Sequence, residues 1–589
     1  MLAVHTVGEQ VDCDFFSLQD AINAAAPGDT IRIARSTSHE GNTYALYGKS
    51  LTLQGGFDSC DAGEAPSGRT TLDAHGANQP VLDIWQGATP PDQMRVVLRD
   101  LELRRGNGGL KMEGQLGRLS VQLQNTGIIE NASSTSGGGI KVLIPHDSAH
   151  DGNSQSLLRI DNDSQISHNS SDGDGGGIYC WQPSGTHFSR IVILVGNALI
   201  SHNTAFNGGG VSSHGCTSMY FDAGAPLLSG VPTGGIYMNS ASLEGGGLHA
   251  RNGGSIHFAG SSSGSLGAED HAAVMMDNSA GYGGAAAVMD SNSYIAFRGV
   301  LATGNTANQD GGVVLAHNGG RFHMGAMTND RSCPPPPDTH GHQAFPPCNY
   351  VIGNSAGNHG GVLRVLNGSY ADISQSYILQ NEAMAGGSVI SVNSAQVGGN
   401  EFASALIESS LLSGNNGITL VFAGNASQIN LHGTTISGNQ VGSLIHIHAV
   451  SGATSRSILE SSIIWGNDTP FMLTRSDTGN TLATAECVIG SQPEPTSGLT
   501  SAIAYLHSDP LFVDAPGGDY RLLPSSPAID FCDDRTNYPS SIGHDLAGNI
   551  RGVPRNEPAQ VPNPALGLYD LGAFEAYPVS AVIFEDGFE

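Results

Sequence analysis

The sequence predicts an all-β protein, a single right-handed parallel β-helix with a short N-terminal capping helix and an irregular C-terminal cap. Two observations support this prediction. Glycine accounts for 81 of the 589 residues, which is about twice its share in ordinary globular proteins. A phrase that joins an asparagine, a glycine cluster and a branched aliphatic residue also recurs along the middle of the chain. Such a repeat is the signature of a solenoid, in which each coil contacts only its neighbours.

The first element that we expect is a short helix over residues 17–24. Ser17 is a suitable N-cap, and Pro27 and Gly28 end the helical pattern. A helix ahead of the first coil would cover the open hydrophobic end of the solenoid. We therefore assign residues 1–108 to the N-terminal cap and the first coils.

The repeated phrase predicts the coils of residues 109–505. Its asparagines are spaced 24 to 49 residues apart, and the shortest spacing suits one coil of a parallel β-helix. The clearest copies begin at Asn131, Asn169, Asn203 and Asn239, and weaker or truncated copies contain Asn278, Asn305, Asn354, Asn381, Asn415, Asn439 and Asn467. Asparagine amides can hydrogen-bond to the equivalent amides of the next coil, while glycine lets the backbones approach closely. We expect Asn169, Asn203 and Asn239 to stack with buried amides.

The chain contains eight cysteines and no CxxC pair, which argues against a structural zinc site. The even number favours disulfide bonds and an oxidising compartment. We predict four consecutive pairs: Cys13–Cys60, Cys180–Cys216, Cys333–Cys348 and Cys487–Cys532. The third pair would close a proline-rich surface loop near residues 329–349. Because residues 1–3 lead straight into polar sequence, we expect a mature exported protein whose leader has been removed.

The charge balance limits the partners of the protein. Lys and Arg total 24 and Asp and Glu total 53, for a formal net charge of −29. Nucleic acid and anionic lipid both need a basic face, so neither is the expected partner. No apolar run approaches the roughly 20 residues of a membrane-spanning helix. We expect a monomer without a membrane span.

The repeat resembles that of polymorphic outer-membrane proteins and autotransporter passengers, which are bacterial right-handed parallel β-helix proteins. The resemblance lies in a GGAI-type phrase paired with an asparagine phrase, as in residues 131–140. We assign residues 506–589 to a C-terminal module that is similar to the terminal module of "choice-of-anchor" exported proteins, on the stretches 509–512, 519–522, 526–530 and 570–575. The resemblance implies a pectin-lyase-like fold and a secreted or cell-surface location. It implies fold more firmly than function, because such proteins include lyases, hydrolases and adhesins.

Alternation along each strand predicts which side chains point outward. If the aliphatic residue after each glycine cluster points inward, the second and fourth residues point to solvent. In four successive coils these outward residues are Lys141 and Leu143, Tyr179 and Trp181, Ser212 and His214, and His249 and Arg251. Aromatic platforms beside cationic groups suit an acidic glycan. We therefore predict a ligand site formed by Tyr179, Trp181, His214, His249 and Arg251.

The same count predicts an apolar outward stripe in the next coils. Its residues would be Ala286, Val288, Val314, Ala316, Leu363 and Val365. An exposed apolar stripe needs a cover, and the loop between Cys333 and Cys348 lies in the right stretch of chain to supply one.

No recognisable catalytic signature accompanies this face. If the protein is an enzyme, a lyase acting on a uronate polysaccharide is favoured over a hydrolase, with Lys141, His249 and Arg251 as candidate catalytic residues. Asp172 and Asp174 could donate oxygens to calcium, but they lack a set of partner ligands. We therefore expect no bound metal and no other cofactor. Calcium is the one alternative that stays open.

Two functions stay open at this point. The first is a non-catalytic adhesin or carbohydrate-binding protein of the bacterial cell surface, whose partner is a polysaccharide or a cell-surface glycan. The second is a polysaccharide lyase or glycoside hydrolase that uses the face between Lys141 and Arg251. The lack of a catalytic signature favours the first.

Overall fold

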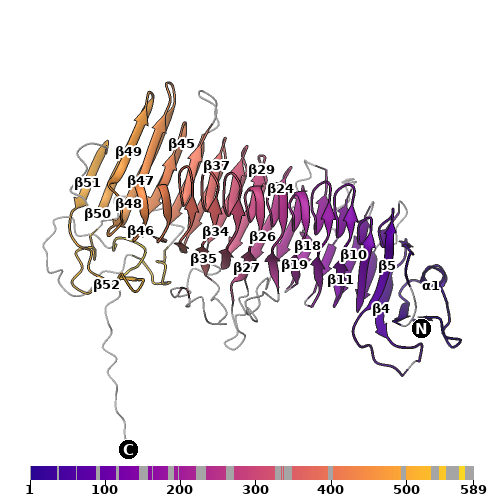
Figure 1. The fold of residues 1–589 in the computed structure, drawn as a ribbon. Coiled ribbons are helices and arrows are strands. Elements are labelled where there is room, and N and C mark those ends of the chain that lie inside the picture. The colour runs from indigo at the N-terminus through magenta and orange to yellow at the C-terminus, as the bar shows by residue number, and fades with distance from the viewer. Residues whose placement is uncertain are drawn as a thin grey trace, which may run out of the picture.

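The computed structural model is a parallel β-helix whose coils stack along one axis (Figure 1). It confirms the all-β fold class predicted from the sequence. The structure describes residues 2–35, 39–61, 63–87, 93–114, 118–144, 157–161, 163–183, 191–196, 198–220, 234–260, 271–325, 333, 336, 348–394, 402–491, 499–531, 543–551 and 569–576. Most of the strands in this part of the chain belong to two long parallel sheets, which we call sheet A and sheet B.

Sheet A contains 29 of the described strands and forms two ladders. The first ladder consists of β1 (Val4–Val7), β2 (Thr30–Ala34), β4 (Leu51–Phe57), β7 (Gln93–Arg99), β10 (Arg118–Gln124), β14 (Leu157–Ile160), β18 (Ile191–Val195), β22 (Thr217–Tyr220), β26 (Ser255–Ala259), β30 (Tyr294–Arg298), β34 (Arg321–Gly325), β38 (Tyr370–Ser374), β42 (Ala403–Glu408), β45 (Ser427–His432), β48 (Thr454–Ile464) and β50 (Asn480–Gly490). The second ladder consists of β5 (Thr70–Ala77), β8 (Leu101–Gly106), β11 (Gly127–Ile129), β15 (Gln165–Ser167), β19 (Leu199–Ser201), β23 (Gly235–Tyr237), β27 (Ala273–Met276), β31 (Val300–Thr303), β35 (Asn349–Ile352), β39 (Ser376–Leu379), β43 (Leu411–Ser413), β46 (Thr435–Ser437) and β51 (Ser501–Leu506). The long strands β48 and β50 extend across both ladders.

Sheet B contains 22 of the described strands and carries the predicted site. Its main ladder consists of β3 (Tyr44–Tyr47), β6 (Leu82–Trp85), β9 (Leu110–Glu113), β13 (Ile140–Leu143), β17 (Ile178–Trp181), β21 (Val211–His214), β25 (Leu248–Arg251), β29 (Ala286–Met289), β33 (Val314–His317), β37 (Leu363–Leu366), β41 (Ile390–Asn393), β44 (Asn416–Ala423), β47 (Gln440–Ala449) and β49 (Phe471–Asp477). A ladder of shorter strands precedes the main-ladder strands from β13 to β41: β12 (Ala132–Ser133), β16 (Ser170–Ser171), β20 (Thr204–Asn207), β24 (Ser240–Glu244), β28 (Ser279–Tyr282), β32 (Thr306–Ala307), β36 (Ser355–Ala356) and β40 (Glu382–Ala383).

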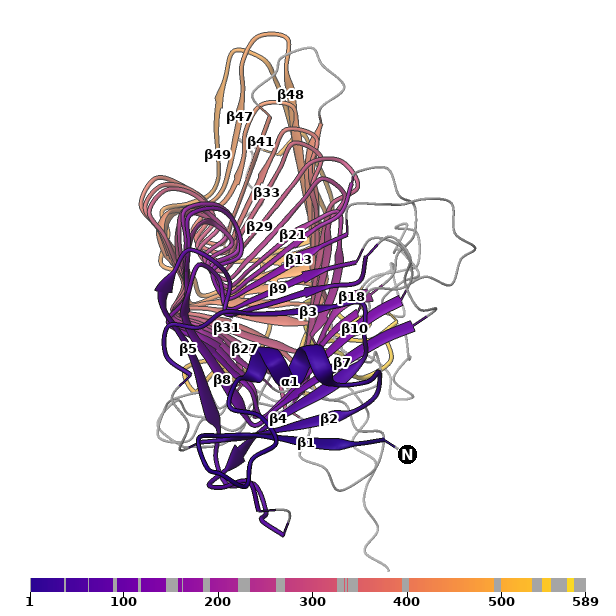
Figure 2. The ribbon, with the colours of Figure 1, turned by 90° about the vertical axis from the view of Figure 1, so that its right-hand side faces the viewer.

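Helix α1 (Leu18–Ala24) closes the N-terminal end of the solenoid, as predicted. Ser17 is its N-cap, and the Ser17 side chain accepts a hydrogen bond from the backbone N–H of Asp20. Leu18 and Ile22 are buried in the same hydrophobic core as the strands. Figure 2 shows α1 lying across the end of the first coils.

The glycine phrase is an architectural element of the coils. The aliphatic residue that follows it opens a sheet B strand and is fully buried, as at Ile140, Ile178 and Val211. A Cβ atom added at Gly209 would lie 2.5 Å from the carbonyl oxygen of Gly246 in the next coil. Only glycine fits such an approach between backbones.

The predicted asparagine ladder is present. The Nδ2 atom of Asn169 donates to Oδ1 of Asn203 at 3.0 Å, and Asn203 donates to Asn239 in the same way at 3.0 Å. All three amides are buried. The ladder is longer than these three residues and runs from Asn131 to Asn467.

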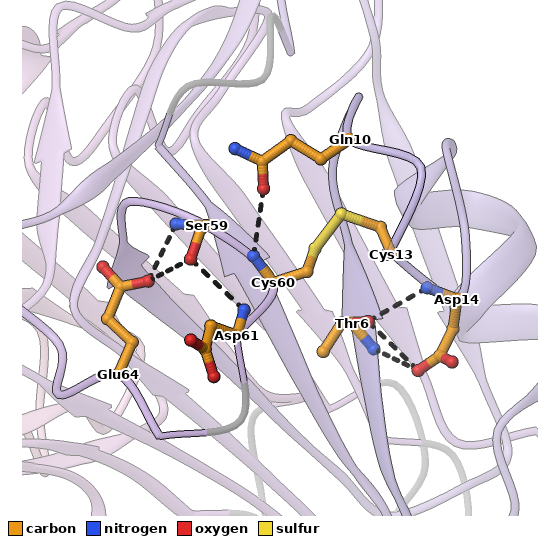
Figure 3. The surroundings of a disulfide bond; sticks show 8 residues. All are labelled: Thr6, Gln10, Cys13, Asp14, Ser59, Cys60, Asp61 and Glu64. Carbon is orange, nitrogen blue, oxygen red and sulfur yellow. Dashed lines mark hydrogen bonds between the residues drawn. A yellow bond between two sulfur atoms is a disulfide. The ribbon is translucent and has the colours of Figure 1, made fainter.

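Three of the four predicted disulfides are observed: Cys13–Cys60, Cys180–Cys216 and Cys333–Cys348. The first joins the segment after β1 to the segment after β4, close to the hydrogen bonds between Thr6 and Asp14 (Figure 3). Cys532 of the fourth predicted pair lies outside the described residues. Three disulfides fit a protein of an oxidising, extracellular compartment.

The C-terminal segment is irregular, as expected, and its described parts pack along the flank of sheet A. The strands β52 (Phe512–Asp514) and β53 (Asp519–Leu522) form an antiparallel hairpin there. Further along the segment, the backbone N–H of Ala573 donates to Oγ1 of Thr435 at 2.9 Å. These contacts connect the C-terminal segment to sheet A and not to sheet B.

Candidate functional site

The outer face of sheet B brings the predicted residues together in the predicted register. The pairing of β13, β17, β21 and β25 forms one row from Lys141, Tyr179, Ser212 and His249. Two residues further along each strand, a second row contains Leu143, Trp181, His214 and Arg251. Figure 2 looks along the solenoid, with strands of sheet B such as β9, β13 and β21 stacked behind one another. Neighbouring strands lie about 4.8 Å apart, so side chains within a row are neighbours.

A third row, which sequence analysis missed, comes from the turn before each glycine cluster. Asp174, Asn207 and Glu244 occupy it and pair with one another in successive coils. The glycine that follows each of them has a positive φ, for example 70° at Gly175. The chain turns at this glycine, so the residues of the third row lie over the outer face of sheet B. A polar residue directly before the first glycine is the sequence signal that could have revealed it.

This third row corrects the predicted exposure of two site residues. His249 is 0% exposed and His214 is 6% exposed, so the prediction that both side chains point to solvent is wrong. The physical reason is that the carboxylates of Asp174 and Glu244 lie against the two imidazoles. The other residues of the predicted ligand site are only partly buried: Tyr179, Trp181 and Arg251.

The first polar chain links Tyr179, His214 and Asp174. Oη of Tyr179 lies 3.4 Å from Nδ1 of His214, and Nε2 of His214 lies 3.1 Å from Oδ2 of Asp174. The second contact is close, but its angle is not that of a good hydrogen bond. Asn207 donates from Nδ2 to the other oxygen of Asp174 at 2.9 Å. The imidazole therefore stands between a phenol and a carboxylate that is held in place.

Burial decides the protonation states in this chain. It lowers the pKa of His214 and outweighs the opposing effect of the nearby Asp174 carboxylate. It also raises the pKa of Tyr179 to about 12. Burial alone would raise the pKa of Asp174, but the close contact with His214 and the hydrogen bond from Asn207 outweigh burial and lower that pKa. At neutral pH the chain therefore holds a neutral phenol, a neutral imidazole and a carboxylate.

The second polar chain links Ser212, His249, Glu244 and His317. Oγ of Ser212 lies 3.1 Å from Nδ1 of His249. Oε2 of Glu244 lies 3.5 Å from Nε2 of His249 and 3.2 Å from Nε2 of His317. Burial alone would raise the pKa of Glu244, but the contacts with His249 and His317 hold it at about 2.

The order of serine, histidine and carboxylate in the second chain resembles a nucleophile triad. A nucleophile has to reach its substrate, and Ser212 and His249 are both 0% exposed. The second chain therefore acts as a buried support for the face. His249, a candidate catalytic residue from the sequence, has no access to a ligand in this structure.

Two cations of the face have no carboxylate partner within the described part of the chain. Nζ of Lys141 donates to Oγ1 of Thr135 at 3.1 Å, and burial, followed by the charge of Lys111, lowers the pKa of Lys141. Nε of Arg251 is buried and makes no hydrogen bond. Both cations lack an ion pair although acidic residues outnumber basic residues by 53 to 24 in the chain.

Beyond β25 the predicted register is wrong by one residue. Ala286 pairs with Leu248, so Ala286 is the first, inward residue of β29. The outward residues of the next three strands are Ala287 and Met289, Leu315 and His317, and Arg364 and Leu366. The expected apolar stripe is instead part of the buried core: Ala286, Val288, Val314, Ala316, Leu363 and Val365.

The reason for this slip is a substitution within the glycine cluster. Gly247 is the third glycine before β25, and in the next coil its position is taken by Ala285, which it contacts through a backbone hydrogen bond. Counting Ala285 as the first strand residue shifted the register. The loop between Cys333 and Cys348 does not cover this face at its disulfide, because Cys333 accepts a hydrogen bond from Tyr377 of sheet A at 2.8 Å.

The two candidate calcium ligands are not directed at a common point. Asp172 is exposed, whereas Asp174 is engaged with Asn207 and His214. Over the described ranges, no group of three or more His, Cys, Asp and Glu side chains could hold a metal ion.

No protein-family model matches the chain, and no curated protein matches it at a significant level of similarity. The fold and the disulfides define the class: a disulfide-bonded parallel β-helix protein. The disulfides fit an extracellular protein. Among the residues that the structure describes, no helix is long and apolar enough to span a membrane.

Proposed function

We propose that this protein is an exported cell-surface or extracellular β-helix protein that binds an anionic glycan along the outer face of sheet B. The observation that carries the proposal is the pair of cations without ion pairs, Lys141 and Arg251, on a face that also presents Tyr179 and Trp181. A carboxylate or sulfate of a glycan would pair with the guanidinium charge of Arg251, a partly exposed residue. The resemblance of the repeat to exported bacterial surface proteins supports the same role.

The aromatic side chains make the face suitable for sugar. Trp181 lies in the same row as His214 and Arg251 and is only partly buried, so part of its ring is open to a sugar ring. His214 carries no charge at neutral pH, because burial lowers its pKa.

The test is binding to an array of neutral, carboxylated and sulfated polysaccharides at several salt concentrations. We expect anionic glycans to bind and the affinity to fall with added salt, because ionic interactions are screened over about 8 Å at physiological ionic strength. Trp181→Ala and Arg251→Ala should each weaken binding about tenfold or more, as losses at the centre of a binding site do.

Two matched variants control for loss of a tryptophan or an arginine elsewhere. Trp465 is also partly buried and Arg456 is exposed, and both lie outside sheet B. Trp465→Ala and Arg456→Ala should leave glycan binding unchanged. Binding that is equal in all four variants, or an array with no bound anionic glycan, would overturn the proposal.

A further inference from the structure

We propose that part of the C-terminal segment is a proton-controlled clasp, which closes over the flank of sheet A in mild acid and loosens in mild base. The clasp consists of residues 543–551 and 569–576. Its control point is the buried carboxyl group of Glu408, which lies where the clasp meets the solenoid. The proposal is independent of glycan binding, because it concerns sheet A and not sheet B.

The clasp lies on the corner at which the first ladder of sheet A passes into the second. Hydrogen bonds at this corner join the clasp to four successive coils: Gln375 to Asp545, Ser409 to Arg551, Thr435 to Ala573 and Ser461 to Gly572. Leu546 and Phe574 of the clasp also pack with Tyr377 and Leu411 of the second ladder. The clasp is therefore held by apolar contacts and by bonds to the corner.

Glu408 is buried at this corner. It is the last residue of β42 and directly precedes Ser409, whose Oγ accepts a hydrogen bond from Nε of Arg551 at 3.2 Å. Glu408 is 2% exposed, whereas Ser404 and Leu406, which alternate with it along β42, are only partly buried. The burial of the outward row thus becomes complete at the residue beside the clasp.

Burial of Glu408 disfavours its charged form. Oε1 of Glu408 is buried and has no hydrogen-bond partner among the described residues. The charged and titratable groups that face it are Asp372 on β38, His432 on β45 and Arg551 of the clasp. Burial raises the pKa of Glu408 to about 7 and Asp372 adds to this rise, while the two cationic partners oppose it only in part.

The two groups that could stabilise a Glu408 carboxylate already have acidic partners. Nε2 of His432 lies 3.0 Å from Oε2 of Glu460 on β48. Nη1 of Arg551 lies 3.5 Å from Oε2 of Glu575, and both of these side chains are 1% exposed. With the clasp closed, an ionised Glu408 would share these partners with two other carboxylates.

The sign of the pH effect follows from the raised pKa. Opening the clasp would expose Glu408 to water, so that its pKa falls towards the ordinary 4.5. Closing then takes up a proton, and it is favoured most below pH 4.5 and progressively less as the pH rises through 7. From these two values, the equilibrium constant for closing should fall up to about 70-fold between pH 5 and pH 8.

The experiment measures hydrogen–deuterium exchange of the full chain between pH 5 and pH 8, with each rate corrected for the intrinsic chemical exchange at that pH. We expect the protection of residues 543–551 and 569–576 to fall by up to about 70-fold over this range. The strands β17 to β25, which lie far from the clasp along the stack, should stay protected throughout and report that the solenoid is folded.

Three variants assign the effect to Glu408. Glu408→Gln keeps the size of the neutral carboxyl group and cannot ionise, so its clasp should be as protected at pH 8 as at pH 5. Asp372→Asn removes a charge that raises the pKa of Glu408, so the loss of protection should move to lower pH. Glu382 is exposed on β40 of sheet B, and Glu382→Gln is the matched control that should keep the wild-type profile.

Three results would overturn the proposal. The first is wild-type clasp protection that stays constant from pH 5 to pH 8, and the second is a Glu408→Gln profile that still falls with pH. The third is an equal loss of protection in β17 to β25, because the pH would then act on the whole solenoid. The protein is measured without a glycan, so none of these results bears on the proposed function.

Discussion

Glu244 shares one carboxylate oxygen between histidines that lie two coils apart. His249 is on β25 and His317 is on β33, and both lie within 3.5 Å of Oε2. On the strand between them, β29, Ala287 pairs with His249 and Met289 pairs with His317.

Stability in acid should depend on this carboxylate. The pKa of Glu244 in the folded protein is about 2, compared with an ordinary value of 4.5. A depressed pKa stabilises the fold fully above the unfolded value, and this contribution is lost as the pH falls from about 4.5 towards 2. We expect Glu244→Gln to remove up to about 3 kcal/mol of unfolding free energy at pH 6, measured by denaturant unfolding between pH 2 and 6.

The difference between the wild type and Glu244→Gln should shrink as the pH falls. Glu382 is exposed on β40, and Glu382→Gln should have little effect at any pH. A difference between the wild type and Glu244→Gln that stays constant from pH 6 to pH 2 would contradict this account, because a loss of packing alone does not titrate.

At the level of the structural elements, the asparagine ladder joins each coil to the next. Oδ1 of Asn239 accepts two hydrogen bonds, from the backbone N–H and from Nδ2 of Asn203. Nδ2 of Asn203 also donates to the carbonyl of Ile166 at 2.9 Å. Each asparagine therefore satisfies buried polar groups in its own coil and in its neighbours, which water cannot reach.

Asn203→Ala should lower the free energy of unfolding by about 1–3 kcal/mol, because it leaves buried donors and acceptors without partners. Urea unfolding followed by circular dichroism measures this loss. Asn42 is exposed in the N-terminal region, and Asn42→Ala serves as the control, with an expected change within about 0.5 kcal/mol. An unchanged midpoint for Asn203→Ala would mean that the ladder bonds are replaced by others.

Register was predictable from the sequence only where the glycine cluster was complete. Three glycines precede β17, β21 and β25, so the first aliphatic residue marked the inward position correctly. At β29 the third glycine is replaced by Ala285, whose side chain also points into the core, and hydrophobicity alone cannot separate the turn from the strand. The sequence did not reveal that Asp174 and Glu244 cover His214 and His249. The alternation along a strand predicts only which side chains point outward, whereas the left-handed turn before the strand decides which residues lie over them.

On the scale of the whole molecule, the solenoid is a one-dimensional array with different ends. Helix α1 closes the N-terminal end, and the described C-terminal segment packs along the flank of sheet A. In such an array each coil contacts mainly its neighbours, so removing one covalent link should destabilise only the coils close to it. The disulfides provide a way to test this, because they lie in different regions of the stack.

The disulfide Cys13–Cys60 closes a loop of 47 residues in the first coils, and a loop of this length contributes about 4 kcal/mol in the chain-entropy account. Replacing both cysteines by alanine should therefore increase hydrogen–deuterium exchange in β1, α1 and β2 and leave β17 to β25 protected. Removing Cys180–Cys216, which closes 36 residues in the middle of the stack, is the matched control and should loosen β17 to β25 while the N-terminal coils stay protected. Mass spectrometry of peptides from both variants measures the pattern. An equal rise in exchange along the whole chain in either variant would show that the coils unfold as one cooperative unit, and the array description would then be wrong.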